Sequence, residues 1–359
     1  MKKSLLVLAL AGAAAGAASV AHAQSAVQIY GNIDVGLIKR TEQSLSIGKR
    51  ANNTLGFKGT EELGNGLKAL FQLEVRYEPD SGTLEQGANG VQRPLFQGQS
   101  RVGLQGAFGM VRIGRGLTAF QESSIQFEPF HGVPSPAGFQ TDLTVAGFNS
   151  DPLGLVGNST NRISNAIFYN SPEVNGFQLN TSIATKEGSA GSAAVIGRGS
   201  AGAPQYRVGS DASANPYSMS LTYRKGAAAL MAAVERNAIE SRLWSVAGYV
   251  MVTPELKLMA SRTVQDRGHT FLNNEEVSSW VVGTHYTVGA GKFIAGYGQK
   301  QAGVVNVGEQ KTKQFSLGYE YSLSKRTYIY ADASNKKGPA SATSPSSTNI
   351  YALGVNHAF

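Results

Sequence analysis

Polar and apolar residues alternate with a period of two along most of this chain. Between residues 67 and 78, Ala, Phe, Leu, Val and Tyr alternate with a set that contains Lys, Gln, Glu and Arg, and the ranges 312–321 and 326–335 repeat the pattern. Successive side chains of a β-strand point to opposite faces, so this period predicts strands with one apolar and one more polar face. The sixteen predicted strands are 26–38, 53–61, 67–78, 99–106, 110–115, 162–170, 177–186, 215–224, 227–236, 242–252, 256–265, 276–287, 292–300, 312–321, 326–335 and 348–359.

The connections between these strands alternate between short and long. Short ones include 62–66, 107–109, 253–255 and 288–291. The long ones are 39–52, 79–98, 116–161, 187–214, 266–275, 301–311 and 336–347, and the short 237–241 interrupts the rule. A transmembrane β-barrel has short periplasmic turns on one rim and long external loops on the other. We therefore predict an all-β fold, a 16-stranded antiparallel transmembrane β-barrel, although a soluble β-sandwich would show the same alternation of faces.

The two ends of the chain agree with export to an outer membrane. Met1-Lys2-Lys3 is a short basic head, 5–18 is an apolar run, and Ala21-His22-Ala23 fits a signal-peptidase site. These features predict a signal peptide over residues 1–23 and a barrel over 24–359; a membrane-anchor helix would need a longer apolar run. The last strand ends on Phe359, an aromatic residue at the position where a barrel closes, and we expect Phe359 to take part in that closure.

Composition excludes several classes of function. The chain has no cysteine, and its net charge of +8 comes from Lys and Arg residues that are scattered along the chain rather than gathered in a block, so no nucleic-acid partner is expected. The histidines lack the spacing of metal ligands, and the G-x-G-x-x-G match at 197–202 lies in a Gly/Ala/Ser-rich stretch without a following helix pattern. No metal or cofactor is expected. A Ser/His/Asp site assembled from distant segments stays open.

The connection 116–161 is far longer than an ordinary loop and contains apolar residues throughout. Exposing so many apolar groups in an external loop would be costly, so we expect this third loop to fold inward against the wall and narrow the lumen; an ordinary folded external loop is the alternative. Its carboxylates Glu122, Glu128 and Asp142 would form the acidic side of the constriction.

Basic residues whose side chains lie on the more polar face of neighbouring strands would form the side of the constriction opposite these carboxylates. A narrow water channel lined by positive side chains focuses a positive potential and favours anions. The candidates are Lys58, Arg76, Arg101 and Arg112, with Arg115 where the chain enters the third loop.

Four stretches of sequence resemble one known family. The most specific is the turn at 59–74, G-T-E-E-L-G-N-G-L-K-A-L-F-Q-L-E, which resembles a turn of the trimeric general porins of the Gram-negative outer membrane. The stretch 27–36 resembles the family's first strand, 102–115 its V-G-L…G-x-V-x-L-G-R hairpin, and 168–177 its Y-x-S-P-x-x-x-G-F turn. With the closing strand, the similarity covers essentially the whole chain after residue 23.

The resemblance implies a homotrimer of 16-stranded barrels, each with its third loop folded inside. By position, Arg115 matches the family's pore-lining Arg, and Lys58 and Arg101 match positions that are basic in members of the family. Many members carry a constriction Arg where this chain has Thr54, so one positive charge is missing and the expected anion preference is weak. Glu128-Pro129-Phe130 resembles the family's Pro-Glu-Phe only loosely.

We therefore expect an outer-membrane porin of a Gram-negative bacterium, without enzymatic activity or cofactor. It would form a water-filled channel for passive diffusion of ions and small hydrophilic solutes, with a weak preference for anions. Its other expected partners are outer-membrane lipid and lipopolysaccharide. An outer-membrane β-barrel hydrolase and a surface adhesin are the alternatives from other classes of protein.

Overall fold

A computed structural model describes most of the chain after residue 25. The described residues are 26–86, 91–132, 137–154, 158–185, 193–198, 204–208, 214–266, 276–304, 308–339 and 346–359. The predicted signal peptide, residues 1–23, lies outside them, as do most of the low-complexity stretches at 188–202 and 341–348.

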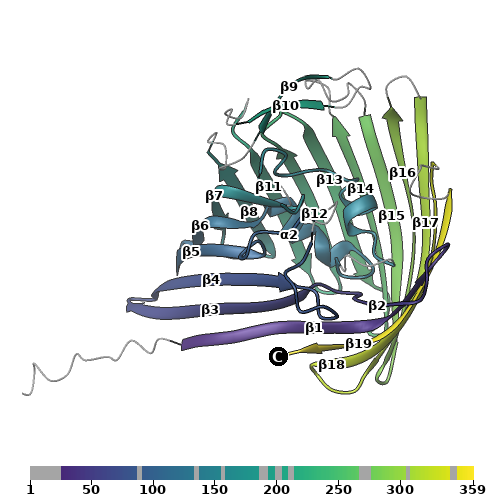
Figure 1. Ribbon diagram of the computed structural model, residues 1–359. Helices are drawn as coiled ribbons and strands as arrows, with labels where there is room; N and C mark the ends of the chain where they lie inside the picture. Colours follow the sequence, from purple (N-terminus) through teal and green to yellow (C-terminus); the bar gives the residue numbers. More distant parts are fainter. Residues whose placement is uncertain are drawn as a thin grey trace, which may run out of the picture.

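Sixteen strands form one closed antiparallel sheet in the part of the chain that the structure describes (Figure 1). This confirms the predicted fold. The strands of the ring are β1 (Ala26–Arg40), β3 (Asn53–Gly64), β4 (Leu67–Tyr77), β5 (Gln99–Gly106), β6 (Gly109–Leu117), β7 (Arg162–Asn170), β8 (Phe177–Ala184), β11 (Tyr217–Lys225), β12 (Ala228–Arg236), β13 (Arg242–Met251), β14 (Leu256–Asp266), β15 (Glu276–Val288), β16 (Gly291–Val304), β17 (Gly308–Ser322), β18 (Thr327–Lys337) and β19 (Ser347–Ala358).

The ring closes where the first strand meets the last. Residues 32–40 of β1 pair antiparallel with 350–358 of β19, while 26–32 of β1 pair with 54–60 of β3. Gly31 and Phe359 exchange two backbone hydrogen bonds, both with N···O distances of 3.1 Å. A short strand, β2 (Ser46–Gly48), pairs with 36–38 of β1 beyond the start of β3. Every strand of the ring therefore has a partner on both sides.

The two rims differ as predicted, with two corrections. The connection expected at 301–311 is only 305–307, because β16 and β17 continue their pairing to Val304 and Gly308. The stretch 187–214 contains a separate hairpin, β9 (Ala193–Arg198) and β10 (Pro204–Val208), at the long-loop rim (Figure 1). The G-x-G-x-x-G match begins in β9.

The alternation of the sequence places apolar side chains on the outer face. On β19, Tyr351, Leu353 and Val355 are exposed, whereas Ile350 and Ala352 are buried on the inner face. His357 lies near the short-turn rim, where its Nδ1 is 2.8 Å from Oγ1 of Thr327. An apolar outer face and a more polar inner face are what a barrel in lipid requires.

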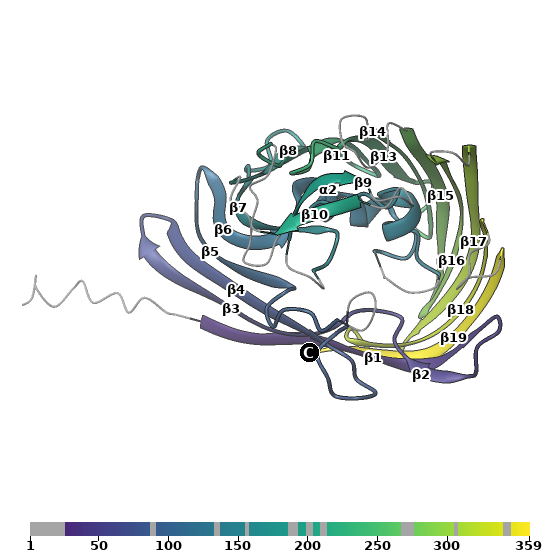
Figure 2. The ribbon, with the colours of Figure 1, turned by 45° about the horizontal axis from the view of Figure 1, so that its top comes forward.

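The described residues of the third loop, 118–132, 137–154 and 158–161, lie inside the barrel, as predicted. It contains helix α2 (Ala119–Ser124), the 3-10 turn η2 (Ile125–Phe127) and the π-helical turn η3 (Gln140–Thr144). Figure 2 shows α2 within the ring of strands. Among the described residues, no helix is long and apolar enough to cross a membrane.

We expect deletion of Phe359 to destabilise the seam. Loss of its two backbone hydrogen bonds with Gly31 should lower the free energy of unfolding by about 2 kcal/mol, since each hydrogen bond contributes about 1 kcal/mol. The temperature at which the folded, fast-migrating electrophoretic form disappears should fall. Phe108→Ala, which truncates another exposed aromatic in a short turn, should leave that temperature unchanged. Equal melting of the deletion variant and the intact protein would contradict this role of Phe359.

Candidate functional site

Small hydroxyl side chains on the inner face of β11 hold the start of the third loop. Thr118 caps α2, since its Oγ1 accepts a hydrogen bond from the N–H of Gln121. The N–H of Phe120 donates to Oγ of Ser218 at 2.9 Å, and Ser123 and Ser220 share a hydrogen bond of 2.7 Å. The alternation of Ser and Thr with larger residues along β11 thus provides both space and partners for the helix.

Two apolar clusters attach the rest of the loop to the inner wall. In the first, aromatic and aliphatic loop residues pack on two alanines and a methionine of β12 and on Leu243 and Ala247 of β13. In the second, Phe130, Phe139 and Leu143 pack on Val281 of β15 and Ile294 of β16. The first cluster consists of Phe120, Phe127, Val145, Phe148, Ala229, Met231, Ala233, Leu243 and Ala247. Burial of these side chains is what keeps the loop inside the barrel.

Glycines on the inner wall permit this close approach. A Cβ atom at Gly296 would lie 2.5 Å from Cε2 of Phe139, and one at Gly318 would lie 2.7 Å from Cε1 of Phe130. Both distances are shorter than non-bonded carbon atoms allow. The two aromatic rings therefore need glycine beneath them.

Glu128 does not line the lumen, and its predicted place on the acidic side of the constriction is wrong. Its side chain is completely buried, and its carboxylate accepts hydrogen bonds from the N–H groups of Gly132 at 2.6 Å and Phe139 at 2.9 Å. Burial raises the pKa of Glu128 to about 7, against the opposing effect of the backbone N–H groups. Glu128 joins the outgoing and returning arms of the loop.

Asp142 attaches the returning arm of the loop to the wall. Its carboxylate forms ion pairs with Lys300 of β16 at 2.8 Å and with Lys336 of β18. Burial acts to raise the pKa of Asp142, but the charges of the two lysines hold this pKa at about 2. The carboxylate faces these two lysines and not the predicted basic residues.

Three of the predicted basic residues meet around one hollow of about 270 Å³ on the inner side of β3, β4, β5 and β6. Arg101 donates to Oε1 of Gln72 at 3.0 Å, and Lys58 lies 5.1 Å from the centre of the Tyr30 ring. The hollow is lined by Gln28, Lys58, Gly59, Thr60, Leu70, Phe71, Gln72, Arg101, Met110 and Arg112. Arg112 is 3.7 Å from the carboxylate of Glu122 on α2, which makes Glu122 the loop residue that faces this side.

The other two predicted basic residues belong to a separate group. Arg115 forms an ion pair with Asp151 at 3.5 Å and donates to Oγ of Ser164 at 2.7 Å, so it fastens the returning arm of the third loop to the wall. Arg76 is 3.7 Å from Glu74 of its own strand and within electrostatic reach of Arg115. The five basic candidates therefore do not form a single cluster.

Arg50 and Arg162 are important residues that the sequence did not point to. Arg50 is fully buried and forms ion pairs with Glu320 at 2.8 Å and Asp332 at 2.9 Å, with the Tyr330 ring 4.7 Å away. Arg162 donates from Nε to the carbonyl of Gly98 at 2.6 Å. Arg50 lies within the connection 39–52 and Arg162 directly follows the connection 116–161, and neither connection shows a periodic pattern from which the side-chain directions could be predicted.

The arrangement around the lumen is that of a polar passage. Among the described residues, no three His, Asp or Glu side chains are grouped so that they could hold a metal ion. The inner wall instead combines charged and amide groups with a loop that occupies part of the cross-section. Such a passage admits solvated ions and restricts them by size and charge.

Comparisons with known proteins agree with this description. The family model described as Gram-negative porin matches residues 8–341. An outer membrane porin protein of Bordetella pertussis is 27% identical, with both chains fully covered. Outer membrane porin protein 32 of Delftia acidovorans is 30% identical over 99% of this chain and 95% of its own.

Solved structures share the fold. The chain is similar to a structure described as an anion-selective porin from Comamonas acidovorans, with a TM-score of 0.73 and 22% identity over 94% of this chain and all of that one. It is also similar to a loop-deletion mutant of OmpT, an outer membrane protein of Vibrio cholerae, with a TM-score of 0.67 and 13% identity over 93% of this chain and 99% of that one.

We expect Gly296→Leu to displace the third loop from the wall and increase single-channel conductance in planar bilayers. The new side chain would overlap the Phe139 ring, and overpacking of this kind costs about 1–3 kcal/mol. Ala295→Leu, which enlarges the neighbouring residue on the outer face of β16, should keep the original conductance. Identical conductance of the two variants would mean that contact with Gly296 does not hold the loop.

Proposed function

The chain belongs to the Gram-negative porin family, and from this premise we propose which of its residues set its ion preference. It is an outer-membrane porin, a channel through which ions and small hydrophilic solutes diffuse passively. Its constriction lies between α2 and the wall of β3 to β6, with Lys58, Arg101 and Arg112 on the wall and Glu122 on the loop. The channel weakly favours anions.

The observation that supports this proposal is the uneven pairing of charges around the lumen. Arg50, Arg115 and Asp142 are each neutralised by close partners of opposite charge. In the described part of the chain, Arg101 and Lys58 form no ion pair. Arg101 donates to Oε1 of Gln72 and lies over the Phe168 ring, and Lys58 lies over the Tyr30 ring. Charges in a water-filled passage narrower than the Debye length of about 10 Å at 0.1 M salt act directly on a passing ion.

The preference is weak because the positive charge is limited. Arg112 is partly balanced by Glu122, and Thr54 occupies the position where a further Arg is common in the family. Arg76 and Arg115 contribute mainly to the shape of the passage, since both have carboxylates close by. The description of the Comamonas acidovorans protein as anion-selective supports the direction of the preference.

We further infer that residues 1–23 form a signal peptide and that the mature barrel spans 24–359. Export through the inner membrane is required for any outer-membrane barrel, and the basic head, apolar run and Ala21-His22-Ala23 supply the signal. The protein acts as a channel without enzymatic activity. Outer-membrane lipid and lipopolysaccharide surround the apolar outer face.

We expect Arg101→Glu to shift the reversal potential in a salt gradient toward cations. The substitution changes the charge beside the hollow by two units, and among the described residues no ion pair of Arg101 screens this charge. The measurement is the zero-current potential of purified protein in a planar bilayer with unequal KCl on the two sides. The wild-type channel should give a potential with the sign of an anion preference.

A matched control separates this effect from the overall charge of the protein. Arg326→Glu makes the same change in an exposed short turn outside the lumen and should leave the potential unchanged. A cation-selective wild-type channel would overturn the proposed preference. Equal shifts in both variants would remove Arg101 from the constriction.

We also propose a homotrimer, the assembly implied by the resemblance to the general porins. The mass of the detergent-solubilised particle, measured by light scattering with the detergent contribution subtracted, should equal three mature chains. A particle containing one chain would contradict the trimer while leaving the channel itself intact.

A further inference from the structure

Arg262 is a charged residue on the outer face of the barrel. It lies on β14 on the same face as Leu258 and Ala260, which point outward. Its cross-strand partners are Val246 of β13 and Trp280 of β15. A charge on the lipid face of a barrel is destabilising to a degree that depends on its depth. The position therefore calls for a compensating group.

The tryptophans of the chain locate Arg262 at the external side of the apolar band. The chain has two, Trp244 and Trp280, and both face outward on the strands beside β14. On β15, Ser278 and Glu276 follow Trp280 toward the long-loop rim. Tryptophan marks the boundary between hydrocarbon and head groups, so Arg262 stands at the level of the head groups of the outer leaflet.

The described part of the chain supplies no counter-charge for Arg262. Within the described ranges, no carboxylate forms an ion pair with its guanidinium and no acceptor takes a hydrogen bond from it, because its direct neighbours across the sheet are Val246 and Trp280. A guanidinium offers five N–H donors in a planar fork that matches the oxygens of a phosphate group. Its surroundings and geometry thus suit a phosphate supplied from outside the chain.

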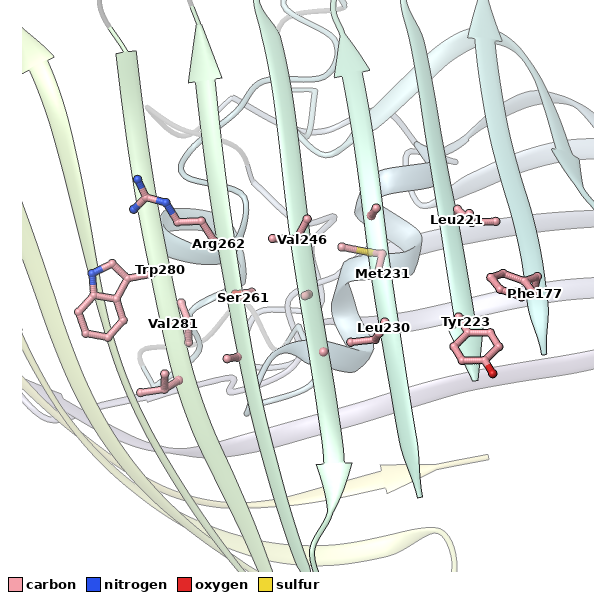
Figure 3. Close-up of a pocket in the computed structure, with 15 residues that line it drawn as sticks. Phe177, Leu221, Tyr223, Leu230, Met231, Val246, Ser261, Arg262, Trp280 and Val281 are labelled. Atoms are coloured by element: carbon pink, nitrogen blue, oxygen red, sulfur yellow. The ribbon is translucent and has the colours of Figure 1, made fainter. Parts of the chain in front are cut away.

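A groove begins at Arg262 and runs across the outer face. It has a volume of about 620 Å³, and its floor is low because Gly248 of β13 and Ala260 of β14 are cross-strand partners and Ala232 of β12 lies diagonally from Gly248. Larger apolar side chains on the same strands, among them Leu230 and Val246, border the floor. In Figure 3, Arg262 and Trp280 lie at one end of this groove and Phe177 and Tyr223 at the other.

We propose that this groove binds one acyl chain of a phosphate-bearing lipid of the outer leaflet, with the phosphate on Arg262. The apolar floor suits a hydrocarbon chain, and the unpaired guanidinium at the external end suits the anionic head group. A second copy of the protein is a poorer occupant, since it would have to bring a carboxylate to the same height of its own apolar band. The proposal rests on the outer-membrane placement and is independent of the ion preference.

Native mass spectrometry of the intact assembly tests the proposal directly. Delipidated wild-type protein is incubated with lipid A, and separately with a diacylglycerol whose chains have the same length but which lacks phosphate. We expect retained adducts with lipid A and at least about tenfold fewer with diacylglycerol. If the wild-type protein retains the two lipids equally, or retains neither, the proposal is overturned.

Substitutions then test the two parts of the site separately, the phosphate contact at Arg262 and the groove for the acyl chain. Arg262→Gln should reduce lipid A adducts about tenfold, Arg262→Lys should preserve most of them, and Ala260→Leu should reduce them by filling the groove. Arg242→Gln is the matched control, because Arg242 faces outward on β13 but does not line the groove. It should bind lipid A as the wild type does.

Two outcomes would assign the face differently. If Arg262→Gln and Arg242→Gln lose adducts equally, the binding is non-specific attraction to a basic rim. If Arg262→Gln or Ala260→Leu instead changes the number of chains in the assembly, a second copy occupies the groove. Folding of each variant is checked by its electrophoretic mobility before heating, and the reversal potential should remain that of the wild type in all of them.

Discussion

The closure of a single sheet on itself is the constraint from which the other features follow. In hydrocarbon, an unpaired N–H or C=O group costs several kcal/mol, so an open strand edge cannot persist there. The pairing of β1 with β19 removes the last edge, and Phe359 completes it through Gly31. Closure also separates an outer face from an inner one. Because successive side chains along a strand point to opposite faces, the face on which a residue lies decides whether its side chain contacts lipid or the lumen.

The inner wall is divided into a part that receives the third loop and a part that stays polar. Small residues on β11 to β17 leave room for the loop, and glycines such as Gly296 and Gly318 allow aromatic rings to lie directly on the backbone. The wall of β3 to β6 instead carries Arg101 and Arg112, which line a hollow that faces Glu122 of α2. The distribution of side-chain size around the ring therefore places the loop on one side of the lumen.

Charged residues in this barrel have two roles. Whether a residue forms an ion pair distinguishes the two. Paired groups such as Arg50 with Asp332, or Asp142 with Lys300, attach segments to one another, because a buried charge is tolerated only beside an opposite one. Groups without an ion pair remain available to solutes and lipid. Among the described residues, Arg101 is of this kind on the inside and Arg262 on the outside, so the lack of an ion pair, and not charge alone, marks the residues that can recognise a ligand.

The sequence by itself determined the strands, their facing, the alternation of the rims and the inward position of the third loop, because a period of two and the apolar content of 116–161 are local properties. It also identified Lys58, Arg101 and Arg112 as inward-facing. It could not distinguish Glu122, which faces Arg112, from Glu128, which is buried against backbone N–H groups, since both are carboxylates in the same loop. The division of the basic residues into two groups, and the meeting of Arg262 with a groove from neighbouring strands, depend on strand register and loop path. Only the tertiary structure decides these, because they arise from contacts between residues far apart in the chain.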